Sequence, residues 1–496
     1  MTFHQGSGVS KFAGMNLKAT WTFGIFLLLL FGACKPDPIT GDGPLEFSED
    51  TVSFDSIFTG YASPSERLIF TNTGNRKIKI DAIYLEAGDQ SEFDMIVDGK
   101  DSNLVKHYEL AAGDSAVIFI KMQSNELDDF VRDRIIFESG GKQQAVVIET
   151  WVLDANFISA PPDSVLVLSC NTVLFPGKPY VLDGIIRVAE GCTLRIEAGT
   201  VIHFTPRKDE NFNLISMIEV LGTLQIAGTL GNEVILQQSR LDGVYEENPG
   251  QWRGIRLWTT SRDNTIRHAI IKNGLIGIEV DSVTVNASPK LLIEQSEIRN
   301  MAGYGLLAIG ASGFPAGTPP IIRADNCLLH NCAFNTMLVY AGGNCEFNNC
   351  TFANYTLDFT RKDPQIGFSN YFEDTAGTVF PFEVDVKFRN CIIWGSEEEE
   401  VGYDTVTLAS FPVKTTFDRC VVRSTFLLSG AGLIFNQDPA FIDPFHEYPQ
   451  HRNYRPGSSS PAINSGEDLS NLFYDDLDGM LRSQPFDIGA FEFFQE

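Results

Sequence analysis

Basic residues are scarce in this sequence, which has 37 Lys and Arg against 64 Asp and Glu and a formal net charge of −27. No basic patch could easily overcome the field of so acidic a chain, so we expect neither nucleic acid nor a broad anionic lipid surface as a partner. The seven histidines lack metal-ligand spacing, and the nine cysteines include no CxxC pair. We therefore expect no cofactor, no metal held by His or Cys, and no catalytic residue among these side chains.

A long apolar run is also missing from the N-terminal region. The run from Trp21 to Phe31 is too short to span a bilayer, and a lysine before it and Gly32-Ala33 after it give the layout of a signal peptide. A cysteine after small residues resembles the lipobox of bacterial lipoproteins. The resemblance implies a signal peptide over residues 1–33, with Met15 as an alternative start, and a lipid on Cys34. A plain secretory signal with an incidental cysteine is the alternative.

Residues 34–44 follow as an expected lipidated tether, because their Pro, Gly and Asp content cannot form a packed element. The acidic stretch after the cysteine resembles signals that send lipoproteins to the outer face of the outer membrane. It implies a membrane partner through the lipid anchor and an outer-membrane location that faces the cell exterior.

Short alternating strands separated by turn residues fill residues 45–155. Seven such strands at this spacing predict an immunoglobulin-like β-sandwich. The segment Phe70-Thr71-Asn72-Thr73-Gly74, followed by Ile78-Lys79-Ile80, resembles immunoglobulin-like domains of the Hydin and SPD-2 type, which are usually spacers or adhesion modules. The absence of a Cys…Trp…Cys framework excludes antibody-type packing.

Six later segments align without gaps: IRHAIIKN (266–273), IEQSEIRN (293–300), ADNCLLHN (324–331), FNNCTFAN (347–354), FRNCIIWG (388–395) and FDRCVVRS (417–424). Their first, fourth and sixth columns are apolar or small, and their last column begins with four asparagines. Because side chains alternate along a strand, these three columns can point inward together only if the chain bends between positions one and four. The polar second and third positions fit that bend.

Stacked coils about 4.8 Å apart would turn these columns into ladders. We therefore predict a right-handed parallel β-helix over residues 160–435, which makes the whole chain all-β. Earlier segments at 185–204, 217–239 and 251–258 continue the pattern, and the run resembles pectate-lyase-like β-helix proteins of bacterial surfaces.

The C-terminal segment, residues 436–496, contains Ser460-Pro461-Ala462-Ile463-Asn464-Ser465-Gly466 and Asp487-Ile488-Gly489-Ala490-Phe491-Glu492. It resembles the closing segment of secreted β-helix proteins of the choice-of-anchor type. We expect it to cover the last coil and block edge pairing. Asp475, Asp476 and Asp478 are a candidate for a structural calcium loop, because carboxylates before a glycine suit a hard cation. The favoured alternative is a capping turn paired with Arg482.

Cysteines recur in the fourth column at Cys327, Cys350, Cys391 and Cys420, where a small apolar thiol suits an inward position. Two other pairs could oxidise in an exported protein: Cys170 with Cys192, one coil apart, and Cys332 with Cys345, on either side of a turn.

The outward columns suggest a working surface. The seventh column contains cations and an indole: Lys272, Arg299, His330, Ala353, Trp394 and Arg423. The fifth column is largely apolar: Ile270, Glu297, Leu328, Thr351, Ile392 and Val421. Alternation also places Trp252, Arg256 and Trp258 outward. Indoles and guanidinium groups suit sugar rings and acidic polysaccharides. The alternative is that loops 301–321 and 355–383 cover these strips.

No catalytic constellation stands out. We expect a monomeric, non-catalytic surface lipoprotein that binds extracellular polysaccharide or acts in adhesion. The alternative is a polysaccharide lyase or glycoside hydrolase on the same β-helix, which would need clustered or paired carboxylates on one outer face.

Overall fold

The structure is a computed structural model that describes residues 45–54, 56–61, 63, 65–123, 129–241, 243, 245–283, 286–355, 360–447 and 449–494. The expected signal peptide, Cys34 and the tether lie outside these residues. Two short 3-10 helices, η1 (Gly88–Gln90) and η2 (Pro449–His451), accompany a set of strands. The described part of the chain contains no helix with the length and hydropathy of a membrane span. The described residues divide into two compact units: most of residues 45–151 form the first, and residues 56–59, with β3, join the residues from 152 onward in the second.

The N-terminal unit contains two sheets that are largely antiparallel. One has the order β1 (Leu45–Phe47), β4 (Glu66–Asn72), β9 (Ser115–Met122), β6 (Phe93–Val97), β7 (Lys100–Asp101). The other has the order β2 (Thr51–Ser53), β11 (Lys142–Leu153), β10 (Asp129–Ser139), β5 (Ile78–Leu85), β8 (Leu104–Leu110), and β3 (Ile57–Phe58) pairs with β11. The arrangement fits the predicted immunoglobulin-like sandwich.

Phe70 of β4 and Phe137 of β10 pack across this sandwich, with ring centroids 5.3 Å apart. At the end of β4, Asn72 is fully buried, and its amide group donates to the carbonyls of Arg76, Leu110 and Ala111. A buried amide is tolerated only when its polar atoms are paired, so this side chain fixes the turn that follows.

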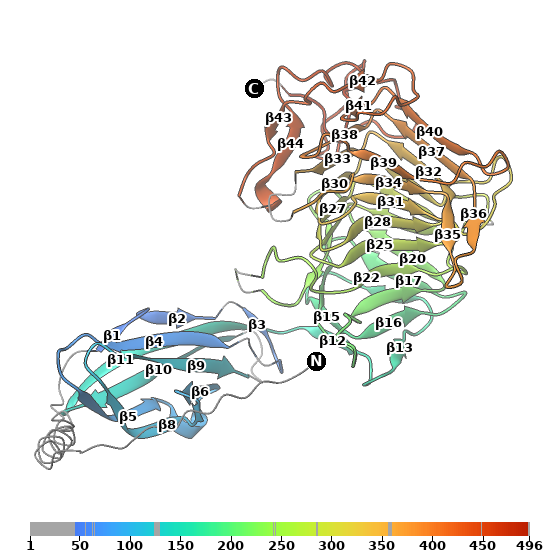
Figure 1. The fold of residues 1–496 in the computed structure, drawn as a ribbon. Helices are drawn as coiled ribbons and strands as arrows, with labels where there is room; N and C mark the ends of the chain where they lie inside the picture. The colour runs from blue at the N-terminus through green and yellow to red at the C-terminus, as the bar shows by residue number, and fades with distance from the viewer. Residues whose placement is uncertain are drawn as a thin grey trace, which may run out of the picture. The chain divides into compact units, whose positions relative to one another are not determined.

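The second unit winds through three parallel sheets in turn, as Figure 1 shows. The long sheet has the order β12 (Asn156–Ser159), β15 (Tyr180–Asp183), β18 (Val201–Phe204), β21 (Val234–Gln238), β24 (Ala269–Lys272), β27 (Glu297–Met301), β30 (Leu328–Cys332), β33 (Thr351–Asn354), β38 (Ile392–Gly395), β41 (Val421–Val422), β42 (Ile434–Phe435).

The second sheet has the order β13 (Val165–Val167), β16 (Ile185–Val188), β19 (Met217–Val220), β22 (Gly254–Leu257), β25 (Ile276–Asp281), β28 (Tyr304–Ile309), β31 (Met337–Tyr340), β34 (Ile366–Ser369), β39 (Val401–Asp404). The third sheet has the order β14 (Thr172–Leu174), β17 (Thr193–Glu197), β20 (Thr223–Ala227), β23 (Asn264–Arg267), β26 (Leu291–Glu294), β29 (Ile322–Asp325), β32 (Gly343–Asn348), β37 (Val384–Arg389), β40 (Val413–Asp418). The predicted parallel β-helix is therefore confirmed.

Each aligned segment runs from the third sheet to the long sheet through the predicted bend. The residue at position three has a positive φ in all six segments: His268, Gln295, Asn326, Asn349, Asn390 and Arg419. This left-handed conformation turns the chain, so positions one, four and six all reach the interior. Phe347, Phe388 and Phe417 of the first column stack with centroids 5.0 Å and 4.9 Å apart.

The cysteine predictions have mixed outcomes. The fourth-column cysteines are buried as expected, and Cys170 and Cys192 form a disulfide. The other pair is not joined: Cys332 and Cys345 are free thiols in the coil core. Burial raises the pKa of each thiol to about 12.

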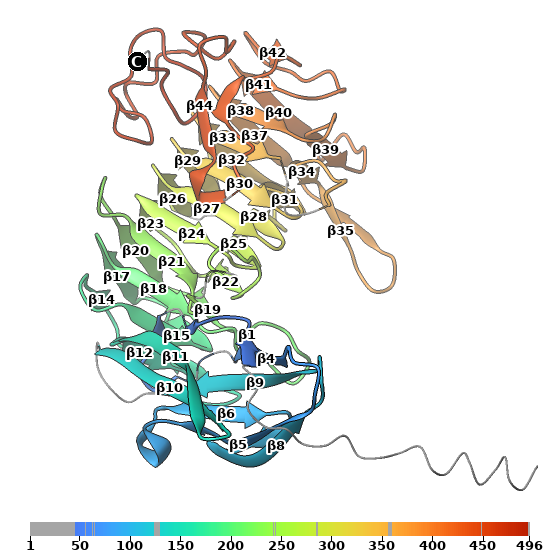
Figure 2. The ribbon, with the colours of Figure 1, turned by 90° about the vertical axis from the view of Figure 1, so that its left-hand side faces the viewer.

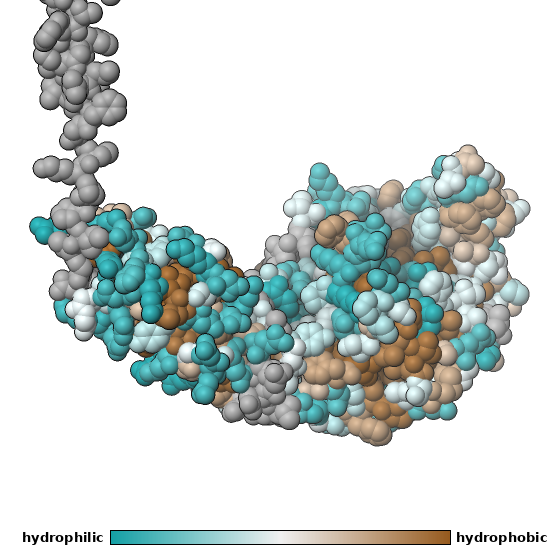
Figure 3. Space-filling model, turned by 90° about the horizontal axis from the view of Figure 1, so that it is seen from below, coloured by the Kyte–Doolittle hydropathy of each residue, from teal (hydrophilic) through white to brown (hydrophobic). Residues whose placement is uncertain are grey.

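The end of the chain returns along the side of the β-helix. The hairpin of β43 (Phe441–Asp443) and β44 (Asn453–Pro456) lies beside the later strands of the long sheet (Figure 1). A second hairpin, formed by β35 (Tyr371–Glu373) and β36 (Val379–Pro381), projects from a different side of the β-helix (Figures 1 and 2). At the opposite end, the first coil leaves Val167 and Phe175 exposed. The view from below shows apolar residues gathered on that side of the unit (Figure 3).

Candidate functional site

Most of the predicted seventh-column strip is not at the surface. Lys272, Arg299, His330 and Trp394 are all at most 7% exposed, so the prediction of an open strip is wrong, and of these four only Trp394 borders the aromatic hollow described below. Glu247, from a loop that precedes β22, forms ion pairs with Lys272 and Arg299. The cations therefore point away from the coil interior, as predicted, but acidic side chains neutralise them and other segments cover them.

The three residues predicted around QWRGIRLW separate in the structure. Trp252 is fully buried; its ring stacks on Phe204 at 3.9 Å, and its indole N–H donates to the carbonyl of Lys272. Its predicted outward position is wrong, because it lies before β22, where the alternation of that strand does not apply. Arg256 and Trp258 do lie outward on the second sheet, where the guanidinium group covers the indole ring at 3.8 Å and pairs with Asp281.

Little of the cover on the long sheet comes from the described residues of the two loops named as the alternative. Residues 301–321 supply β28 of the second sheet, and residues 355–383 supply β34, the projecting hairpin and Tyr355, which packs against the outward columns. The C-terminal segment packs on the outward columns, in a cluster of Leu328, Ala353, Ile392, Trp394, Val421, Phe441, Tyr454, Ala462, Ile488, Ala490 and Phe491. The C-terminal segment therefore lies along the outer face of the long sheet. The sequence predicts instead that it covers the last coil.

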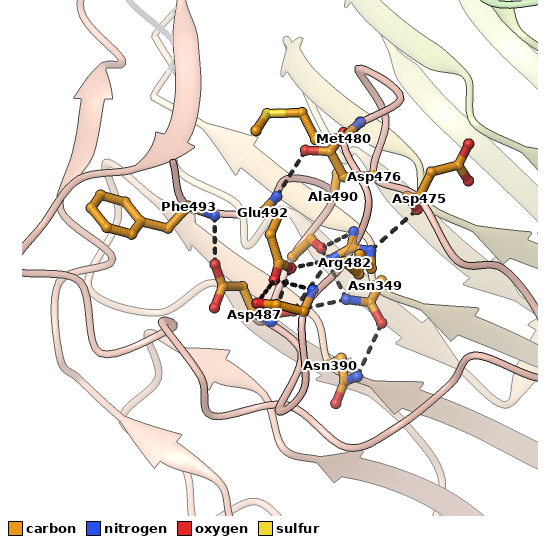
Figure 4. Close-up of polar contacts among 12 residues, drawn as sticks. Asn349, Asn390, Asp475, Asp476, Met480, Arg482, Asp487, Ala490, Glu492 and Phe493 are labelled. Atoms are coloured by element: carbon orange, nitrogen blue, oxygen red, sulfur yellow. Dashed lines mark hydrogen bonds and ion pairs between the residues drawn. The ribbon is translucent and has the colours of Figure 1, made fainter. Parts of the chain in front are cut away.

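Arg482 fastens this segment to the bends of the coils (Figure 4). Its guanidinium group donates to Asn326 Oδ1 at 2.7 Å and to the carbonyl of Gly489 at 2.9 Å, and it lies 3.4 Å from Glu492. Asn349 donates to the carbonyls of Asp487 and Gly489. The side chains of the bend and of Arg482 thus bind the backbone of the closing motif.

The aspartates of the calcium candidate are engaged by protein groups. Arg455 pairs with both Asp476 and Asp478, and Asp476 also accepts the backbone N–H groups of Met480 and Glu492. Arg482 reaches only the carbonyl of Asp475 in this stretch, so the capping turn exists but its arginine is Arg455. Within the described residues, no group of three or more His, Cys, Asp or Glu side chains is arranged to hold a metal ion.

Two hollows remain on the outer face of the long sheet beside the C-terminal segment. The first, which we call the aromatic hollow, has a volume of about 650 Å³. It is lined by Tyr355, Trp394, Gly395, Ser396, Glu398, Arg423, Thr425, Asn436, Asp438 and Phe445. Two residues of the predicted strip, Trp394 and Arg423, therefore meet in one site, with the guanidinium carbon 5.5 Å from the indole centroid.

The second, the polar hollow, has a volume of about 390 Å³. Its lining includes Glu233, His268, Ile270, Glu297, Leu328, Gln450, Tyr454, Arg455, Asp478 and Phe491. Tyr454 lines this hollow and Tyr355 lines the aromatic one, and the two rings stack with centroids 6.3 Å apart. The two hollows thus lie on either side of a tyrosine pair.

Sequence reasoning missed most of these lining residues. Tyr355, Glu398 and Phe445 belong to no repeat, and nothing in their local sequence marks them as neighbours. The signals in the sequence were Trp394 and Arg423 of the seventh column, Ile270, Glu297 and Leu328 of the fifth column, and Asp478 of the calcium candidate.

Residues 281–438 match the family model described as a right-handed beta helix region. No curated protein matches the chain. Among solved structures, it is distantly similar to a family 123 glycoside hydrolase from Clostridium perfringens, at 9% identity over 24% of this chain and 30% of that one, with a TM-score of 0.17. The chain therefore spans less than a third of that protein.

Two further structures align over most of their length. One is XylC in complex with xylose, at 10% identity over 90% of this chain and 89% of that chain, with a TM-score of 0.30. The other is the catalytic unit of a GH87 alpha-1,3-glucanase from Streptomyces thermodiastaticus, at 12% identity over 80% and 94%, with a TM-score of 0.23. Similarities this loose carry no argument about the activity of the chain.

Proposed function

We propose that this protein is a lipid-anchored surface protein that binds a neutral glycan, without cleaving it, in the aromatic hollow. The observation that carries the proposal is the meeting of three rings around one cavity: Trp394 from β38, Tyr355 after β33 and Phe445 after β43. Aromatic faces pack on the apolar faces of sugar rings, and a few polar groups around them fix the orientation of a ligand.

Polar groups of the right kind are available in this hollow. Among the described residues, neither the Tyr355 hydroxyl nor the Glu398 carboxylate has a hydrogen-bond partner, and the exposed Phe445 ring lies edge-on to Tyr355 at 4.9 Å. Burial, with Asp438 nearby, raises the pKa of Tyr355, so its hydroxyl remains a donor. A sugar hydroxyl could therefore both donate and accept here.

The charge of the lining favours a neutral glycan over the acidic polysaccharide expected from the sequence. The aromatic hollow contains two carboxylates, Glu398 and Asp438, against one guanidinium group, Arg423. The other cations of the strip, Lys272 and Arg299, are already paired with Glu247 and Glu297. An acidic ligand would face net repulsion in a chain of this overall charge.

Calorimetric titration with cellohexaose, xylohexaose, mannohexaose and laminarihexaose tests the proposal. Phe445→Ala removes a ring that is 61% exposed, and Phe175→Ala removes one that is 60% exposed in the first coil. A lost ring contact of about 1 kcal/mol should weaken binding about fivefold in the first variant and leave it unchanged in the second. Binding of no hexasaccharide, or equal loss in both variants, would refute the proposal.

The anchor is tested separately. Cys34→Ser should abolish labelling of the protein by a radioactive fatty acid and release it from the membrane fraction, because the acyl chains supply the membrane affinity. Continued labelling of the variant would contradict the lipoprotein assignment.

An enzymatic function, as a lyase or glycoside hydrolase, is the second candidate. Glu297 and Asp478 line one cavity, and their pKa values move in opposite directions, which is the pattern of an acid–base pair. Release of reducing or unsaturated ends in the same titrations, abolished by Glu297→Gln, would favour this function.

A further inference from the structure

We propose that the polar hollow binds a protonated primary amine, carried by one unacetylated amino sugar within a glycan whose other sugars are neutral. The inference rests on the proposed function only in assigning the amine to a glycan. The recognition of the amine itself follows from the hydrogen-bonding groups of the hollow.

Glu297 presents an ionised carboxylate in this hollow. Its Oε1 accepts the Nε2–H of His330 at 2.9 Å and lies 2.8 Å from the Nε of Arg299, and both of these side chains are buried. Burial raises the pKa of Glu297, but Arg299 and His330 outweigh that effect and bring the pKa to about 2. No hydrogen bond from a described residue reaches the second oxygen, Oε2, so a charged acceptor is held in place and left free.

The other walls add acceptors. Gln450 Oε1 is buried without a hydrogen-bond partner among the described residues. Glu233 accepts only the backbone N–H of Gly231 and has no ion pair in the described part of the chain. A buried, unsatisfied acceptor costs free energy that a ligand donor would recover.

Several donors of the hollow already bind protein groups. Arg455 is committed to Asp476, Asp478 and the carbonyl of Glu492. Arg452 donates to the carbonyl of His446. Burial lowers the pKa of His268, which favours its neutral form. The lining contains three carboxylates, Glu233, Glu297 and Asp478, against the two guanidinium groups of Arg452 and Arg455, so an ammonium group, with three donors and a positive charge, is the complementary ligand.

The shape favours a sugar-sized carrier for the amine. The cavity of about 390 Å³ has apolar contacts on Ile270 and Leu328 and rings on Tyr454 and Phe491. Its position across the Tyr454–Tyr355 pair from the aromatic hollow suits a ligand that extends along the outer face of the long sheet.

The test compares a hexamer of glucosamine with a hexamer of N-acetylglucosamine by calorimetric titration at pH 6, where the amines are protonated. We expect the wild type to bind the glucosamine hexamer at least about tenfold more tightly, a preference that shrinks as salt is added. Equal affinities, or no binding of the glucosamine hexamer, would overturn the inference.

Three variants locate the site. Glu297→Gln and Asp478→Asn should each reduce the preference for the amine at least about fivefold, and Asp478, 60% exposed, can be changed with little risk to the fold. Glu197→Gln is the matched control, since this carboxylate is ion-paired with Arg195 on the third sheet and is 30% exposed against 24% for Glu297. Retention of the preference in both hollow variants, or its equal loss in Glu197→Gln, would place the amine elsewhere.

Two further measurements distinguish an amine on a sugar from a simple amine, and the polar hollow from the aromatic hollow. Cadaverine that binds as tightly as the glucosamine hexamer would show that the hollow selects amines without a sugar, and would overturn the glycan assignment. Phe445→Ala should weaken both hexamers equally, whereas Glu297→Gln should change only the difference between them. A failed aromatic site and a failed amine site therefore give different results.

Discussion

The inner and the outer columns of the long sheet lie on the same strands but have different neighbours. The inward Cys327, Cys350, Cys391 and Cys420 are buried by residues one coil away, so the contacts repeat with the sequence. The outward side chains and those of the bend also contact residues 139 to 180 positions distant, as in the contacts of Thr351 with Ala490, of Asn326 with Arg482 and of Gln295 with Asp475. A repeat therefore predicts its own interior but not what is packed on its outside.

The first coils show the same difference. His203 of β18 is buried on the outer face of the long sheet, where the ring of Phe58 lies 4.8 Å from the imidazole. The imidazole Nδ1 donates to the carbonyl of Gln238. Both ends of this face thus depend on segments that lie outside the repeats.

The largest expected effect is in an inner column. Cys350→Arg should lower the free energy of unfolding by about 5 kcal/mol, because it places an unpaired charge in a filled core, whereas Cys350→Ala should cost only about 1 kcal/mol. Chemical denaturation of both variants measures the difference. Rapid reaction of native Cys350 with a bulky thiol reagent would show that the column is not closed.

The next effect concerns the outer cover. Arg482→Met should lower the free energy that holds the C-terminal segment on the long sheet by about 4 kcal/mol, because it leaves the buried carboxylate of Glu492 without this guanidinium group. The loss should appear as faster proteolysis between residues 460 and 490, with the coils intact. Equal resistance to proteolysis in the wild type and in Arg482→Met would mean that the apolar cluster alone holds the C-terminal segment in place.

A pH effect is expected at His203. Burial lowers its pKa to about 4, so between pH 6.5 and 4 the unfolded chain binds a proton that the folded chain excludes. The contribution is fully present above pH 6.5 and is lost as the pH falls towards 4, by at most about 3 kcal/mol. His203→Gln should flatten the dependence of unfolding free energy on pH in this window. An unchanged slope would mean that His203 binds a proton equally well in the folded and the unfolded chain.

The smallest expected effect is at the edge of the aromatic hollow. Phe445→Ala should change the free energy of unfolding by less than about 0.5 kcal/mol, because the ring is mostly exposed. Thermal unfolding at constant pH checks this. A loss above about 1 kcal/mol would assign the ring to the packing of the C-terminal segment, with no role reserved for a ligand.

The fold was largely readable from the sequence. The small fourth column, the bend at position three and the TNTG turn each follow from contacts within a strand, a turn or an adjacent coil. The candidate sites were not readable in this way. The sequence places Trp394 and Arg423 in an outward row of cations with an indole. They line a hollow because Phe445 and Asp438 lie beside them.

The sequence by itself determined the inward pattern, because hydrophobic burial acts at fixed spacing and each coil supplies the same surface to the next. Only the tertiary structure decided which outward side chains remain accessible. The C-terminal segment is recognised through Arg482 and the asparagines of the bends, and those long-range hydrogen bonds have no period in the sequence. Where that segment lies fixes the two hollows, and so it fixes the chemistry that the outer face can offer to a ligand.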